Sequence, residues 1–169
     1  MSLTLAQLNT LPTERFTAAL GGIFEHSPWV AAQAAGLRPF ASVADLHGCM
    51  RRQVEEAGVE AQLRLIRAHP ELAGKAALHG EVTAESAAEQ GGAGLDRCSP
   101  QELELLRRLN ADYRARFGFP FILAVRGYQR ADIIAEFQRR LAAEPAAERQ
   151  ACLQQIYRIA GLRLAELIA

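Results

Sequence analysis

The stretch SPQELELLRRLNADYRARFG, residues 99–118, decides the fold class of this 169-residue chain. Ser99, Pro100 and Glu102 supply the N-cap, the first helical position and the third helical position of a capping box. Apolar residues then recur at helical spacing as far as Phe117, and Gly118 is the residue type at which helices commonly end. The stretch therefore predicts a helix over residues 100–117.

Comparable helical patterns recur along the rest of the chain. They begin near Pro12, Ser42, Ala131 and Leu153. The only strand-like run is FPFILAV, residues 119–125. Its Pro120 and the lack of a second strand to pair with favour a buried extended segment. The sequence predicts an all-α fold, with residues 1–169 forming a single-domain bundle of about seven to nine helices.

Composition excludes several classes of protein. The chain has 19 basic and 19 acidic residues, so its formal net charge is zero and nucleic acid is not expected as a partner. We find no run of about 20 apolar residues and no basic, apolar leader, so we expect no membrane partner and no standard export. Three widely spaced cysteines (Cys49, Cys98 and Cys152) form neither a disulfide framework nor a zinc knuckle pattern. A reducing, cytoplasmic location fits best.

The segment HPELAGK, residues 69–75, places an imidazole where a helical pattern stops. The preceding apolar residues follow helical spacing, and Pro70 disfavours helical geometry at His69. We therefore expect His69 at a helix exit. An imidazole titrates near neutral pH, so it can act as an acid or a base. The alternative is that the His-Pro pair is only a helix stop.

A second set of polar residues follows in TAESAAEQGG, residues 83–92. Ser86, Glu89 and Gln90 stand at i, i+3 and i+4, which puts a hydroxyl, a carboxylate and an amide on one helix face. Such a face can hold a polar ligand. The competing interpretation is an ordinary solvated helix face.

Near the C-terminus, Arg163 lies on the flank of an apolar helical stripe that includes Ile159 and Leu167. We expect its side chain to be partly buried. A buried guanidinium requires a structural carboxylate or a bound anion as its partner. The third alternative is that the side chain extends to solvent.

These and other motifs resemble the 2-oxo-4-hydroxy-4-carboxy-5-ureidoimidazoline (OHCU) decarboxylase family, whose members form (S)-allantoin from a urate oxidation product. The resemblance covers nearly the whole chain, in several separate blocks. The blocks are FEHSPWV (24–30), HPELAGK (69–75), Ser86 with Glu89 and Gln90, AGL (93–95), Asn110 with Tyr113, FGFPF (117–121) and Arg163 with Leu164. It implies an all-helical, cofactor-free homodimer that acts as a carboxy-lyase in purine degradation.

Carried over position by position, the resemblance implies that His69 is the catalytic acid or base and that Glu89 supports it. The residues implied in substrate binding are Pro70, Ser86, Gln90, Phe121, Ile122 and Arg163. Loss of CO2 leaves an electron pair, which the conjugated imine of the substrate ring can accept. We therefore expect neither an organic cofactor nor a metal.

An alternative hypothesis is a helical module that binds a ureide or a small carboxylate without turning it over. Such a module can use Glu89, Gln90 and Arg163, but it does not need His69. A metal enzyme is a more distant alternative, because the four histidines show no compact ligand spacing. They are His26, His47, His69 and His79.

Overall fold

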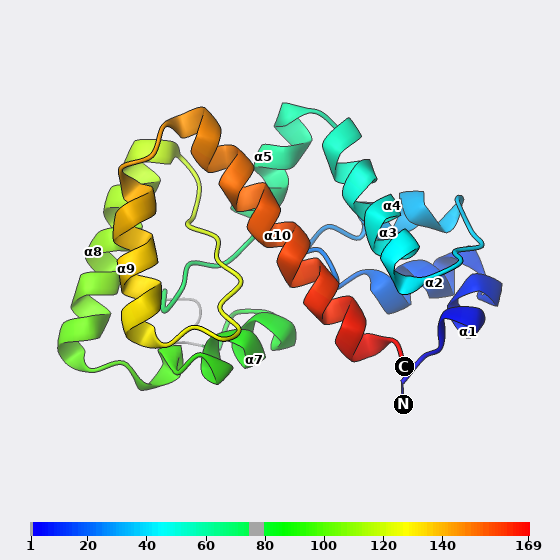
Figure 1. Ribbon diagram of the computed structural model, residues 1–169, viewed down its shortest axis with the longest axis horizontal. Helices are drawn as coiled ribbons and strands as arrows, with labels where there is room; N and C mark the ends of the chain where they lie inside the picture. The colour runs from blue at the N-terminus through cyan, green and yellow to red at the C-terminus, as the bar shows by residue number, and fades with distance from the viewer. Residues whose placement is uncertain (1, 75–79) are drawn as a thin grey trace. The chain divides into compact units, whose positions relative to one another are not determined.

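The computed structural model describes residues 2–74 and 80–169, and the chain divides into two compact units (Figure 1). The first unit is Met1–Ala68 with Tyr157–Ala169, and the second is His69–Ile156. Lys75 and His79, both singled out in the sequence, lie outside the described residues. That the chain works as one domain stays a prediction.

Within the described residues the structure has nine α-helices, one short 3-10 helix and no strand. The helices are α1 (Leu5–Thr10), α2 (Thr13–Leu20), α3 (Trp29–Ala35), α4 (Val43–Glu56), α5 (Val59–Arg67), α7 (Ala84–Gly92), η1 (Leu95–Arg97), α8 (Pro100–Phe117), α9 (Arg130–Leu141) and α10 (Pro145–Leu167). The all-α prediction is confirmed. None of these helices has both the length and the apolar character that crossing a membrane would require.

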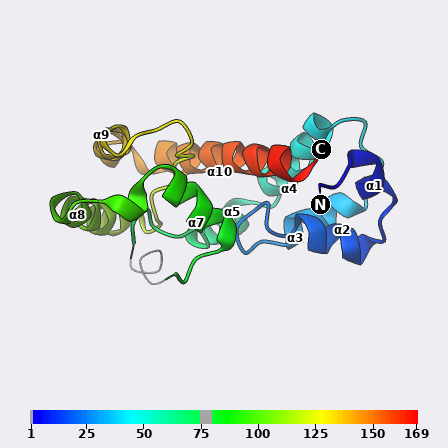
Figure 2. The same cartoon turned by 90° about the horizontal axis from the view of Figure 1, so that it is seen from below.

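In the first unit, α2 packs against α3 and α3 against α4. Their inward faces bury Phe16, Val30 and Leu46 almost completely. The two ends of the chain lie close together (Figures 1 and 2), because the Leu3 amide donates to the Leu167 carbonyl and the Ala169 amide to the Leu3 carbonyl. The end of α10 is thereby tied to the start of the chain.

In the second unit, α8 has the caps that its sequence predicts. The Ser99 hydroxyl accepts the Glu102 amide at 3.1 Å, and the Glu102 carboxylate accepts the Ser99 amide at 3.0 Å. Gly118 ends the helix in the left-handed region, with φ of 76°. The helix packs against α9, and its Tyr113 lies at the centre of an aromatic cluster. The cluster also includes Phe117, Phe119, Phe121 and Phe137.

Residues 119–125 form a buried extended segment and not a strand, as the sequence predicts. No strand among the described residues pairs with this segment, and side chains bond to its backbone instead. The Ala124 amide donates to Gln155 Oε1 at 3.0 Å, and Arg140 Nη1 donates to the Ile122 carbonyl at 2.5 Å. Both partners come from helices of the same unit.

Candidate active site

His69 lies directly after Ala68, the C-cap of α5, so the predicted helix exit is confirmed. The residue is 7 % exposed, whereas the adjacent Pro70 is partly exposed. A buried imidazole at a helix exit is held in one place more firmly than a side chain on a surface loop. This placement suits an acid or base that must meet a substrate in one orientation.

The turn that follows His69 is held by three long-range contacts. Glu71 pairs with Arg114 at 3.0 Å, the Leu72 carbonyl accepts Asn110 Nδ2 at 3.0 Å, and the Ala73 amide donates to Gln90 Oε1 at 2.9 Å. The last two contacts are buried. Ala73 has φ of 50°, a left-handed conformation that residues other than glycine adopt only where their surroundings enforce it. The turn is therefore built to keep one shape.

Helix α7 carries the polar face that the sequence predicts. Thr83 caps the helix, since its hydroxyl accepts the Ser86 amide at 3.2 Å. Ser86 and Gln90 are buried and Glu89 is partly buried. A fully solvated face is therefore the wrong interpretation for Ser86 and Gln90.

Gln90 has a role that sequence reasoning missed. Its side-chain oxygen accepts the Ala73 amide, so the side chain joins α7 to the turn after His69. Asn110 does the same from α8 through the Leu72 carbonyl. The available signal was a polar residue, Asn110, within the buried stripe of Leu106, Leu109 and Tyr113. These two amides bring the His69 turn, α7 and α8 together.

Phe121 and Ile122 are buried in the extended segment of this second unit. The Ile122 carbonyl is already bonded to Arg140, so the structure fixes the peptide group between Ile122 and Leu123. Substrate contact by these two residues stays a prediction.

Arg163 belongs to the first unit, and it has the structural carboxylate that was one of its predicted partners. Its Nη1 donates to Glu25 Oε2 and to the Gly22 carbonyl, both at 2.9 Å. Both charged side chains are at most 5 % exposed, so extension to solvent is the wrong alternative. A role of Arg163 in substrate binding stays a prediction.

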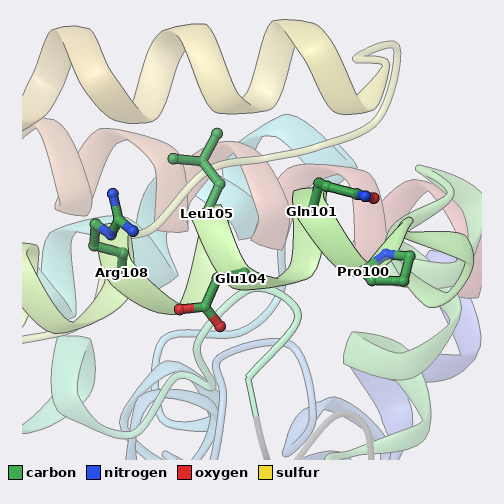
Figure 3. Close-up of a pocket in the computed structure, with 5 residues that line it drawn as sticks. All are labelled: Pro100, Gln101, Glu104, Leu105 and Arg108. Atoms are coloured by element: carbon green, nitrogen blue, oxygen red, sulfur yellow. The ribbon is translucent and has the colours of Figure 1, made fainter.

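Two hollows in the second unit are lined by other residues. One, of about 370 Å³, lies along α8 and is lined by Pro100, Gln101, Glu104, Leu105 and Arg108 (Figure 3). The other, of about 390 Å³, lies near Gly94, Tyr128 and Arg130. None of the predicted site residues lines either one.

The histidines in the described part of the chain do not form a metal-binding cluster. His26 is exposed, whereas His47 Nε2 lies 2.8 Å from the Tyr157 carbonyl. Residues 2–74 and 80–169 contain no group of three or more His, Cys, Asp or Glu side chains that could hold a metal ion. Independence from metals stays a prediction.

The fold and the geometry around His69 define an all-helical protein with a buried histidine, and the turn that follows this histidine is bonded to a polar helix face. A family model described as OHCU decarboxylase matches residues 9–165. The chain therefore belongs to the OHCU decarboxylase family, and the resemblance drawn from its motifs is confirmed.

Individual relatives agree with this assignment. The chain is 46 % identical over 164 residues to the 2-oxo-4-hydroxy-4-carboxy-5-ureidoimidazoline decarboxylase of Haloferax volcanii, with 97 % of this chain and 95 % of the relative covered. It is also 46 % identical over 165 residues to the uric acid degradation bifunctional protein of Bacillus subtilis, covering 98 % of this chain and 33 % of that protein. A crystal structure of (S)-allantoin synthase superposes with a TM-score of 0.81 at 29 % identity, over 99 % of this chain and 54 % of that one.

Proposed function

We propose that this protein catalyses the decarboxylation of 2-oxo-4-hydroxy-4-carboxy-5-ureidoimidazoline to (S)-allantoin, as a carboxy-lyase of urate degradation. Family membership over nearly the whole chain supports the proposal. The structural observation that carries it is the bond between Gln90 and Ala73, which joins the turn of the buried His69 to the polar face of α7. A binding module would not need this histidine.

The chemistry requires orientation and proton transfer more than an external electron sink. When the carboxylate leaves as CO2, its bonding pair passes into the conjugated imine of the substrate ring. His69 acts as the acid or base that transfers the proton of the ring hydroxyl, or it protonates the enol-like intermediate. Protonation on one face gives a single enantiomer. Glu89 stabilises the protonated imidazole. Neither a metal nor an organic cofactor takes part in this scheme.

The remaining predicted residues hold the substrate. Ser86 and Gln90 bind polar edges of the ring and of the ureido group. Gln90 uses the NH2 of its side-chain amide, because its Oε1 already accepts the Ala73 amide. Pro70 and the backbone of Phe121 and Ile122 complete the contacts. For Arg163, which belongs to the first unit, the family resemblance implies that its planar guanidinium stabilises anionic or carbonyl oxygens.

We further propose that the chain is a cytoplasmic homodimer. Dimerisation follows from the family resemblance. A reducing compartment is supported by three free cysteines, two of them buried. Light scattering on the purified protein tests the dimer, and a monomeric mass at working concentration would contradict it.

Activity is tested with the unstable substrate generated in situ in the assay. Urate is oxidised and hydrolysed enzymatically, this protein is added, and (S)-allantoin is followed by circular dichroism. We expect the signal of one enantiomer to appear faster than without the protein. Dialysis against a strong chelator should not change the rate. An unaccelerated signal combined with binding of a non-reactive ureide would favour the binding module instead.

The role of Glu89 predicts a loss of turnover without loss of the fold. Glu89→Gln keeps the size of the side chain but removes the charge that supports protonated His69, so kcat should fall about tenfold or more. Steady-state kinetics measure the effect. The matched control is Glu85→Gln, an exposed position on the same helix, which should leave kcat unchanged. Equal kinetics for the two variants would remove Glu89 from the mechanism.

A further inference from the structure

The second unit contains a buried pair of opposite charges that the proposed mechanism does not use. Arg140 on α9 and Glu148 on α10 are 3 % and 1 % exposed. Arg140 Nε and Nη2 lie 2.8 Å and 2.6 Å from Glu148 Oε1. Desolvating two charges is costly, and an apolar pair of similar volume often serves stability as well or better. Stability alone is therefore a weak reason for this pair.

The rest of the guanidinium contacts the extended segment. Arg140 Nη1 donates to the Ile122 carbonyl at 2.5 Å, and the guanidinium carbon lies 4.4 Å from the centre of the Phe121 ring. One side chain thus contacts two consecutive residues that the resemblance assigns to substrate binding. The planar fork of arginine makes this possible, since separate edges point at the carboxylate and at the carbonyl.

Further contacts fix the carboxylate and the aromatic ring. The Tyr113 hydroxyl donates to Glu148 Oε1 at 2.5 Å and lies 3.3 Å from Cys152 Sγ. Burial raises the pKa of Tyr113 far above its usual range, so the hydroxyl keeps its proton. Phe137 stacks on Phe121 with 4.0 Å between ring centres. Helices α8, α9 and α10 thus each contribute a side chain that fixes this arrangement.

We propose that Arg140 and Glu148 are positioning residues, which set the place of the Phe121 ring and of the Ile122 carbonyl against the substrate. Arg140 holds the Ile122 carbonyl and the Phe121 ring, and Glu148 holds Arg140. The inference rests on the proposed function, because contact between this segment and the substrate belongs to that proposal. It adds two residues, neither of which touches the substrate itself.

Two variants separate positioning from stability. Arg140→Lys keeps a charge opposite Glu148 but loses the fork and the contact with the Phe121 ring. The double variant Arg140→Met with Glu148→Leu removes both charges, keeps the volume and should stay folded. Both should lower kcat/KM by about tenfold to a hundredfold, because small misplacements of contacting groups have large effects on rate. The control Arg139→Lys changes the adjacent exposed arginine, which pairs with Glu136, and should change nothing.

A second measurement does not depend on activity. Amide exchange over residues 119–125 should become about tenfold faster in both variants and stay unchanged in Arg139→Lys. Normal kinetics in a folded double variant of an active enzyme would overturn the inference. If the unmodified protein has no decarboxylase activity, the proposed function fails and exchange alone decides. Faster exchange then supports only that Arg140 and Glu148 hold the segment, and unchanged exchange overturns that as well.

Discussion

Replacing His69 by asparagine should lower kcat by about a hundredfold or more while the protein stays folded. Asparagine keeps a polar side chain of smaller but similar shape, and it cannot accept and return a proton at neutral pH. The turn after residue 69 should survive, since Asn110, Gln90 and Arg114 each bond to it. Steady-state kinetics with substrate generated in situ measure the fall in kcat, and thermal unfolding checks that the variant is folded.

The matched control for this substitution is His26→Asn. His26 is exposed and has φ of 47°, a conformation that asparagine tolerates well. It should keep normal turnover and stability. A folded His69→Asn protein with turnover close to that of the control would show that the imidazole does no proton transfer.

The helices were predictable because their signals are local. The capping box at Ser99 and the glycine at 118 both involve residues within one turn of the helix end, so sequence spacing alone placed α8. The extended segment at 119–125 was predictable for a related reason, since Pro120 and the absence of a pairing strand are visible in the sequence. The division into two units was not, because it depends on which helix faces meet.

The candidate site was predictable in its residue types and not in its contacts. Helical spacing placed Ser86, Glu89 and Gln90 on one face, and the structure buries two of them. The sequence spacing could not show that Gln90 bonds the Ala73 amide, which lies 17 positions away. Likewise, the sequence left three alternatives for Arg163, because its partner Glu25 is 138 positions distant. Long-range pairing is decided by packing, which single-sequence patterns do not encode.

The pair of Glu25 and Arg163 gives the largest expected change in stability. Glu25→Ala removes a carboxylate that is 1 % exposed and leaves the Arg163 cation buried without it. Losing one member of a buried pair typically costs about 3–5 kcal/mol in the free energy of unfolding. For a chain of this length, each kcal/mol lowers Tm by roughly 2–4 °C, so we expect a drop of about 6–20 °C in calorimetry.

Two further variants identify the cause of that drop. Glu55→Ala breaks the exposed pair with Arg51 in the same unit and should cost less than about 1 kcal/mol. The double variant Glu25→Leu with Arg163→Met removes both buried charges and should recover much of the lost stability, because the buried cation is removed together with its carboxylate. If the double variant is no more stable than Glu25→Ala, the loss comes from packing around Glu25 and not from its charge.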